Sequence, residues 1–179
     1  MFKQLVEYEL PTPKEDKPVP QYKIYCDMDG VLTDFQARFE HYSGMAPKVY
    51  ETTYGTEAFW TLIDQKVGIK FWSGMDWMPQ GQLLWKFIEP YRPQLLTSPS
   101  RDNNSRLGKN LWVRENFLVP PKTIFAYSKD KRRYAAPDAI LIDDKKSNIR
   151  EWIKDGGIGI RCKNGDSIAV IQELQNLGY

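Results

Sequence analysis

Two aspartates separated by one residue, Asp27 and Asp29, follow a short apolar segment near the start of the chain. Carboxylates this close together repel each other unless a cation lies between them or one of them holds a proton. The pair therefore indicates a metal site or an acid–base couple. The alternative is structural, because aspartate after a strand also forms turns and caps helices. For Asp34, which precedes the helical segment Phe35–Tyr42, we expect a helix cap.

A second acidic pair favours the metal site. Asp143 and Asp144 come at the end of the strongly apolar run Ala139–Ile142. One acidic pair could be a turn, but two pairs that each terminate a buried strand make a site for a hard cation the better interpretation. Mg²⁺ is the expected ion, because it prefers a few carboxylates together with water and substrate phosphate oxygens.

Residues that could bind a phosphate lie between the two acidic pairs. Thr97 and Ser98 end another apolar run, and their hydroxyl and amide groups can donate to phosphate oxygens. Lys131 follows a further strand-like run and could neutralise the phosphate's charge. Each signal is weak alone, because Thr-Ser-Pro is a common turn and a single lysine is usually a solvated surface charge. Three neighbouring cations are rivals for the same role: Lys129, Arg132 and Arg133.

Short apolar runs that predict buried strands recur along the chain and alternate, in its second half, with helical patterns. We expect strands at Tyr22–Cys26, Gln94–Thr97, Thr123–Tyr127, Ala139–Ile142 and Gly157–Arg161. We expect helices at Arg106–Phe117, Ser147–Lys154 and Asp166–Leu177. This alternation favours an α/β fold, a parallel sheet flanked by helices. Ligands of such sheets bind beyond the carboxyl ends of the strands, which is where the acidic pairs lie.

The long interval after the first strand predicts a small helical cap at residues 35–92. It is rich in aromatic residues and too long for a structureless loop in a compact domain. The α/β core accordingly comprises residues 21–34 and 93–179. Residues 1–20 are expected to form an extended N-terminal arm, because positions 11–20, PTPKEDKPVP, combine four prolines with four charges.

The composition restricts the class of protein. A chain of 179 residues that is 41% hydrophobic can bury one core and a small insert. Its net charge of +2 gives no global field toward nucleic acid or a membrane, although the basic segment 99–133 suits a small anionic ligand. Two cysteines are too few for a disulfide framework, and no apolar stretch resembles a membrane span or a signal peptide. We therefore expect a cytoplasmic protein that does not associate with a membrane.

Taken together and in this order, these groups resemble the four motifs of the haloacid dehalogenase-like superfamily: DxD, a Ser or Thr after a strand, a Lys, and an acidic pair. The resemblance implies a Rossmann-like fold in which Asp27 is the nucleophile that forms an aspartyl-phosphate and Asp29 is the general acid and base. It implies phosphate ligands at Thr97, Ser98 and Lys131. It implies that Mg²⁺ is bound by Asp27, Asp143, Asp144 and the backbone carbonyl of Asp29.

Within the superfamily the sequence is most similar to the 5'(3')-deoxyribonucleotidases, which also carry a small helical cap after the first motif. The similar strings are DMDGVLTDF at 27–35, LLTSPS at 95–100, Lys109 followed by Trp112-Val113, Asp130-Lys131, and LIDD at 141–144. The resemblance implies that Lys109 is a further phosphate ligand. It also implies aromatic walls around a nucleobase: Phe35, with Phe59, Trp60, Phe71 or Trp72. For each cap aromatic the alternative is a place in the cap's own core.

The implied activity is Mg²⁺-dependent hydrolysis of nucleoside monophosphates, deoxyribonucleotides above all, through an aspartyl-phosphate. One rival is the same chemistry on another small phosphoester or on a DNA 3'-phosphate end, although near-neutral charge disfavours extended nucleic acid. Another rival is a catalytically silent member that binds a nucleotide or a protein through its cap. An inactive member is expected to have lost a motif residue, and this chain retains them all. A homodimer is left open.

Overall fold

The centre of the molecule is a five-stranded, wholly parallel sheet with the strand order β3-β2-β1-β4-β5. The computed structural model describes residues 22–179, so the predicted N-terminal arm at residues 1–20 lies outside the described residues. The strands are β1 Lys23–Cys26, β2 Gln94–Thr97, β3 Thr123–Phe125, β4 Ala139–Asp143 and β5 Ile158–Arg161. All five predicted strands are confirmed, and the predicted α/β fold with them.

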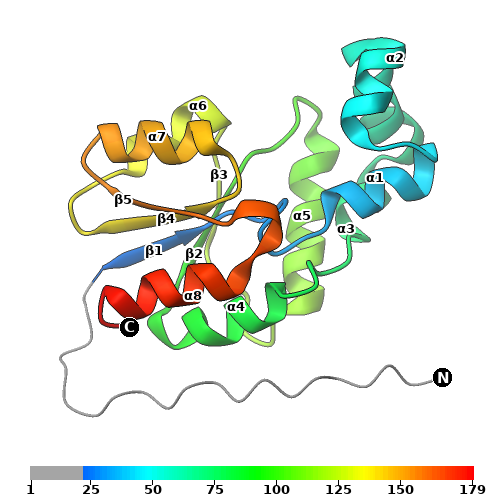
Figure 1. The fold of residues 1–179 in the computed structure, drawn as a ribbon. Helices are drawn as coiled ribbons and strands as arrows, with labels where there is room; N and C mark the ends of the chain where they lie inside the picture. The colour runs from blue at the N-terminus through cyan, green and yellow to red at the C-terminus, as the bar shows by residue number, and fades with distance from the viewer. Residues whose placement is uncertain (1–21) are drawn as a thin grey trace.

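Helices cover both faces of this sheet (Figure 1). Their bounds are α1 Phe35–Ser43, α2 Pro47–Trp60, α3 Ile69–Ser73, α4 Gly81–Ile88, α5 Asn103–Asn116, α6 Ser128–Lys131, α7 Lys146–Lys154 and α8 Ser167–Asn176. A π-helical segment, η1, spans Thr61–Val67 between α2 and α3. Helix α7 packs on one face of the sheet, whereas α4 and α8 lie side by side on the opposite face.

The alternation of side chains along β1 explains why both faces are covered, since successive residues of a strand point to opposite faces. Ile24 and Cys26 belong to the larger core, which also contains Trp112 of α5. Tyr25 points the other way and meets Trp152 of α7 in an edge-on contact with ring centroids 5.5 Å apart. After the exposed Lys23, every residue of β1 is thus buried, on one face or the other, as expected for a strand inside a parallel sheet.

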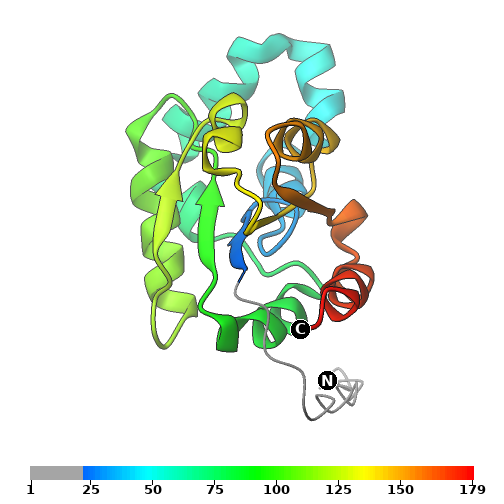
Figure 2. The same ribbon diagram turned by 90° about the vertical axis from the view of Figure 1, so that its left-hand side faces the viewer.

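Helices α1 and α2 stand beyond the carboxyl ends of the strands. Figure 2 shows β2 and β3 running toward them. Phe39 of α1 is fully buried there and stacks on Phe59 at a centroid distance of 4.7 Å. Phe39 also packs edge-on against the buried Phe71. Part of the aromatic content after the first strand thus packs between these helices as an extension of the larger core.

The predicted boundaries of the cap, between residues 34 and 35 and between residues 92 and 93, stay predictions. Helix α4, which the sequence analysis included in the cap, packs beside α8 on the sheet side of the molecule. Its buried residues Leu84 and Ile88 belong to the same core cluster as Leu174 of α8. This packing favours an end of the cap near residue 80.

A tight loop joins β1 to α1 and fixes the direction of the residues after the strand. The carbonyl of Met28 accepts the amides of Val31, Leu32 and Thr33 at 3.1, 2.8 and 2.9 Å. Asp34 then caps α1, since its side chain accepts the amide of Ala37 at 2.9 Å. The predicted helix cap is confirmed.

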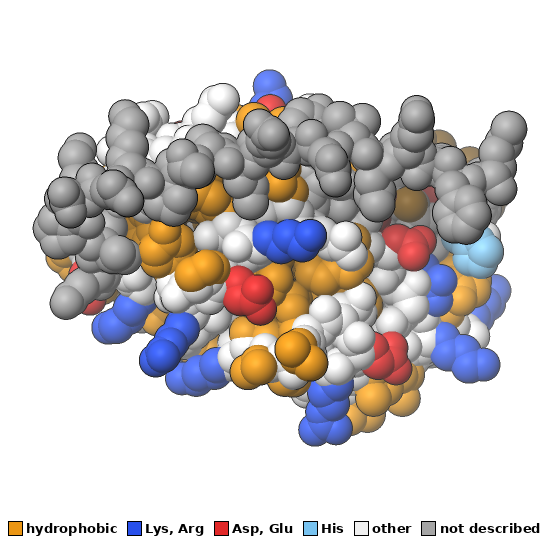
Figure 3. All heavy atoms as spheres, turned by 90° about the horizontal axis from the view of Figure 1, so that it is seen from below, with side chains coloured by type: hydrophobic (Ala, Val, Ile, Leu, Met, Phe, Trp, Pro, Cys, Tyr) orange, Lys and Arg blue, Asp and Glu red, His pale blue; other side chains and the backbone are white. Residues whose placement is uncertain are grey.

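Charged side chains of both signs appear on the surface seen from below in Figure 3, interspersed with hydrophobic ones. This mixture agrees with the formal net charge of +2. Among residues 22–179, no helix combines the length and the apolar character needed to cross a membrane.

Replacement of Trp152 tests the smaller of the two cores. This side chain is fully buried, and its indole N–H donates to the carbonyl of Ala139 at 3.2 Å. Trp152→Ala should lower the free energy of unfolding by about 3 to 5 kcal/mol, because it leaves a large cavity. The neighbouring Ile153 is 53% exposed, so Ile153→Ala should change it by no more than about 0.5 kcal/mol. Urea unfolding measures both; equal effects would contradict the two-core description.

Candidate active site

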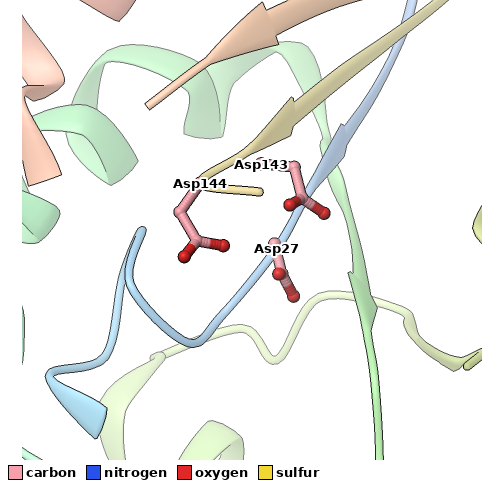
Figure 4. Close-up of side chains that lie close together, drawn as sticks. All are labelled: Asp27, Asp143 and Asp144. Carbon is pink, nitrogen blue, oxygen red and sulfur yellow. The ribbon is translucent and has the colours of Figure 1, made fainter. Parts of the chain in front are cut away.

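Three carboxylates converge at the carboxyl edge of the sheet. Asp27 directly follows β1, while Asp143 ends β4 and Asp144 follows it. The two strands are neighbours, with Cys26 paired to Ile142, so the acidic residues that follow them must meet. Ligand atoms of the three carboxylates lie within 4.8 Å of one another, and the close-up in Figure 4 shows the three side chains close together beyond the ends of the strands.

Asp27 is buried and held at both oxygens. Oδ1 accepts the backbone amide of Met28 at 2.8 Å, and Oδ2 lies 2.9 Å from Lys131 Nζ. Burial alone would raise the pKa of Asp27, but the positive charges of Lys131 and Lys109 hold that pKa below its ordinary value. The carboxylate is therefore ionised, as a nucleophile must be.

Lys131 is the cation that neutralises this corner. Its side chain is 1% exposed and contacts Asp27 Oδ2 and Asp143 Oδ2, the latter at 2.7 Å. Burial favours the neutral amine, but the two carboxylates raise the pKa of Lys131 above its ordinary value. Within residues 22–179, two carboxylates take two of its three N–H groups, so the third can donate to a phosphate oxygen.

The rival cations occupy other environments. Arg132 pairs with Asp155 and Glu151 on the surface, and Arg133 pairs with Asp130. Lys129 is exposed and lines the rim of the cleft described below. The structure thus brings Lys131, and none of its three neighbours, into contact with Asp27.

Asp143 and Asp144 are held differently. The amide nitrogen of Asn148 donates to both oxygens of Asp143, at 3.1 and 2.9 Å, and the backbone N–H of Lys145 donates at 2.8 Å. Burial and the charge of Asp27 raise the pKa of Asp143. Burial and the charges of Asp27 and Asp143 raise the pKa of Asp144 to about 7. Oδ1 of Asp144 is buried and finds no hydrogen-bond partner in the described part of the chain.

This donor set fits Mg²⁺. Repulsion among three carboxylates and a buried oxygen without a partner are both relieved when a hard cation binds there. Asp27, Asp143 and Asp144 supply carboxylate oxygens, while the backbone carbonyl of Asp29 stays a predicted ligand. Gly30 makes room for the group, since a Cβ at this residue would lie 2.9 Å from Asp144 Oδ2.

Asp29 and Lys109 form a second ion pair beside the first. Asp29 accepts from Thr33 Oγ1 at 3.1 Å and from Lys109 Nζ at 2.7 Å. Lys109 is fully buried and also donates to Thr97 Oγ1 at 2.7 Å and to the carbonyl of Ser98 at 3.0 Å. Its three N–H groups are therefore all bonded to the protein. The predicted phosphate contact of Lys109 stays a prediction and requires one of these partners to be exchanged.

A cleft of about 1500 Å³ opens over these groups. On its core side it is lined by Asp27, Asp29, Asp144 and Ser98. On its cap side it is lined by four of the predicted base-binding residues: Phe35, Phe59, Trp60 and Trp72. The fifth aromatic considered, Phe71, is fully buried and does not line the cleft. The predicted catalytic carboxylates and the aromatic walls thus share one cavity, and their roles stay predictions.

Two contacts of this site were missed by reasoning from the sequence. Asn148, in the first turn of α7, orients Asp143 through two hydrogen bonds. The sequence signal that could have indicated this contact is an amide residue five positions after the first acid of the pair. Tyr127 and Ser128 also line the cleft, and Ser128 Oγ lies 3.3 Å from Ser98 Oγ. Nothing in the local sequence marks this second pair as cleft residues.

No family model matches the sequence, and neither does any curated protein. Among solved structures, the chain is similar to a protein from Bacteroides fragilis provisionally named a haloacid dehalogenase-like hydrolase, with 16% identity and a TM-score of 0.50 over 87% of this chain and 93% of that one. A magnesium complex of a haloacid dehalogenase family enzyme from Bacteroides thetaiotaomicron matches at 15% identity and a TM-score of 0.48, over 81% and 94%. A hydrolase from Pseudomonas syringae matches at 11% and 0.47, over 85% and 89%. The fold is that of haloacid dehalogenase-like hydrolases.

Substitution of two glycines tests the acidic cluster as a metal site. Gly30 and Gly44 both have a positive φ, +78° and +69°, so alanine at either costs about 1 to 2 kcal/mol of unfolding free energy. Only at Gly30 would the new Cβ crowd a carboxylate, because nothing lies within 4 Å of it at Gly44. Gly30→Ala should weaken Mg²⁺ binding by about 10-fold or more, and Gly44→Ala should not. Calorimetric titration compares them; equal affinities would contradict the assignment.

Proposed function

We propose that this protein is a Mg²⁺-dependent phosphomonoesterase that hydrolyses nucleoside monophosphates, deoxyribonucleotides above all, through an aspartyl-phosphate at Asp27. The observation that carries the proposal is the environment of Asp27, an ionised carboxylate paired with the buried Lys131 at the floor of the cleft. Asp29 and the cap aromatics line the same cleft. The residues proposed as nucleophile, as acid–base group and as walls for a ring thus line one cleft, which supports the proposal.

In the first half of the proposed reaction, an oxygen of Asp27 attacks the phosphorus of the bound ester. The bond between phosphorus and the nucleoside oxygen breaks, and Asp29, which must bind a proton in the substrate complex before this step, gives that proton to the leaving oxygen. Lys131 donates its remaining N–H to a phosphate oxygen, and Ser98 donates its hydroxyl or amide. These donors neutralise the phosphoryl oxygens and keep the attacking and leaving atoms in line.

In the second half, Asp29 removes a proton from a water molecule as that water attacks the aspartyl-phosphate. The bond between phosphorus and Asp27 breaks, and inorganic phosphate and the regenerated carboxylate result. The net reaction consumes one water and releases one nucleoside and one phosphate. Thr33 and Lys109 hold Asp29 in place for both proton transfers.

Asp27, Asp143, Asp144 and the Asp29 carbonyl would hold Mg²⁺, which would supply positive charge that offsets the phosphoryl oxygens and the repulsion among the carboxylates. Asp143 is kept rigid for this purpose by Asn148. Asn148 thus acts on the metal site through Asp143, as groups behind a metal ligand commonly do.

The aromatic walls support a nucleotide as substrate. Phe35 makes an edge-on contact with Phe71 of the cap core at 5.3 Å, while its own ring lines the cleft beside Trp60 and Trp72. Flat aromatic side chains of this kind can stack on any nucleobase. The rivals are another small phosphoester, a DNA 3'-phosphate end, and a silent member that only binds nucleotide or protein. The intact pairs of Asp27 with Lys131 and Asp29 with Lys109 favour activity over silence.

Phosphate release from a panel of deoxy- and ribonucleoside monophosphates tests the activity. Asp27→Asn should reduce turnover to below about a thousandth of the wild-type rate, because the amide cannot act as the nucleophile. Asp138→Asn alters an exposed aspartate that pairs with Lys23 far from the cleft and should leave turnover unchanged. If an aryl phosphate were the only ester hydrolysed, the proposed chemistry would stand and nucleotides would be excluded as the substrate. No release from any ester would favour the binding protein.

Removal of a cap aromatic tests the proposed stacking. Trp60 is 39% exposed and lines the cleft, whereas Tyr54, also on α2, is 57% exposed and does not line it. Trp60→Ala should raise the KM for deoxynucleoside monophosphates between about 5-fold and 100-fold, the range expected for the loss of one stacking partner. Tyr54→Ala should leave KM unchanged. If both variants had the same KM, the proposed contact between Trp60 and the base would be wrong.

A further inference from the structure

Asp64 is a buried carboxylate that the proposed reaction does not use. It lies in the π-helical segment η1 between α2 and α3 and is 7% exposed. Burial raises the pKa of Asp64, and a hydrogen bond from Ser100 opposes that rise. Among residues 22–179, no Lys or Arg forms a salt bridge with it. Burying a carboxylate without a cation costs stability, and π-helical turns frequently occur at functional sites, so the contacts of Asp64 indicate what this cost maintains.

Asp64 connects the cap to the loop that follows β2. Its Oδ1 accepts the hydroxyl of Ser100 at 2.9 Å, and its backbone carbonyl accepts the side-chain amide of Asn104 at 3.1 Å. The Ser100 amide in turn donates to Ser105 Oγ at 3.0 Å, and the Asp102 amide donates to Ser100 Oγ at 3.2 Å. The η1 turn is thus bonded to the segment 100–105, which leads into α5.

Each end of this connection carries part of the proposed substrate site. On the core side, Ser100 stands three residues after Thr97 and two after Ser98, the predicted phosphate ligands. On the cap side, η1 leads through Gly68 into α3, which carries the aromatic wall residue Trp72. Both Ser100 and Trp72 line the cleft.

Helix α3 and helix α5 are also in close contact, which makes the connection stiff. A Cβ on Gly108 of α5 would lie 2.5 Å from the Cβ of Trp72 and 2.7 Å from the carbonyl of Ile69. The ammonium group of Lys109 lies 5.1 Å from the centroid of the Trp72 ring. A shift of η1 relative to the segment 100–105 would therefore move the wall at Trp72 relative to the phosphate ligands.

We propose that Asp64 is a positioning residue that sets the separation between the aromatic wall of the cap and the phosphate-binding loop through its hydrogen bond with Ser100. This separation favours phosphoesters in which a sugar lies between the ring and the phosphate. It disfavours esters in which the ring is attached directly to the phosphate. This inference rests on the proposed function, because it assumes that the ring binds at the cap wall and the phosphate at Thr97 and Ser98.

The kinetic test compares two substrates that differ in the spacing of ring and phosphate. Asp64→Ala should lower kcat/KM for deoxynucleoside monophosphates between about 5-fold and 100-fold, mainly through KM, because a buried hydrogen bond is lost and the wall shifts. Turnover of p-nitrophenyl phosphate, whose ring has no sugar spacer, should stay within about 3-fold of wild type. Asp64→Asn keeps an acceptor for Ser100 and should restore most of the nucleotide activity. Thr52→Ala, on an exposed cap hydroxyl, is the matched control.

Amide hydrogen exchange tests the contact without relying on turnover. Asp64→Ala should speed exchange in the segment 100–105, and Asp64→Asn and Thr52→Ala should not; exchange in β4 should be unchanged in all three. Unchanged exchange in that segment, or equal losses on both substrates, would overturn the positioning role. Wild-type protein that hydrolyses the aryl phosphate but no nucleotide would contradict the proposed function. In that case the proposed role of Asp64 in substrate preference would fail together with the proposed function. Faster exchange in Asp64→Ala would still show that Asp64 connects the cap to the segment 100–105.

Discussion

Lys131 lies between Asp27 and Asp143 with its side chain only 1% exposed, and the rest of the site depends on how this buried charge is balanced. An ammonium group buried alone would lose its proton, and two carboxylates buried alone would take one up. Together, Lys131 lowers the pKa of Asp27 and the two carboxylates raise that of Lys131, so this pair stays ionised, while burial and the charge of Asp27 raise the pKa of Asp143. Asp144, farther from the lysine's influence, keeps a pKa raised to about 7 and an oxygen without a partner in the described chain. Asp144, which lines the cleft, is therefore the carboxyl whose negative charge the protein itself compensates least, and a divalent cation bound beside it would supply the missing positive charge.

The sheet places these charges without further guidance from side chains. Adjacent parallel strands end at the same edge, so Asp27 after β1 and Asp143 at the end of β4 become neighbours through backbone pairing alone. The loop after β1 then turns back on the Met28 carbonyl and leaves Gly30 against Asp144. Helix α5 supplies Lys109 from behind, and the close approach of α3 to Gly108 ties the cap wall to the same helix. Core and cap are thus joined where the substrate would bind.

The sequence was most informative where chemistry and local structure coincide. Five short apolar runs each end at a polar residue, and all five strands and the cap role of Asp34 follow from local patterns. The convergence of Asp27 with Asp143 and Asp144 could be expected, because parallel pairing is the economical arrangement of such runs. The contacts that could not be expected join segments far apart in the chain. Asp64 with Ser100 and Trp72 with Lys109 depend on how α3 packs on α5, which no local pattern encodes. The side of the molecule on which α4 lies was hidden for the same reason.

The two buried lysines, Lys109 and Lys131, differ in how many of their N–H groups are bonded to described residues. Lys109 donates to Asp29, Thr97 and the Ser98 carbonyl, so every N–H it has is used to hold the acid–base group and the phosphate-binding loop together. Lys131 donates to two carboxylates and keeps one N–H free of the described residues. Neither lysine is among the residues that line the cleft. A contact of Lys109 with a phosphate would release Asp29, Thr97 or the Ser98 carbonyl, whereas Lys131 could donate its third N–H without giving up a carboxylate. The geometry therefore favours Lys131 as the lysine that meets the phosphate first and Lys109 as the one that keeps Asp29 aimed at the reacting oxygen. Sequence similarity alone assigns both lysines to phosphate, and only their hydrogen bonds distinguish them.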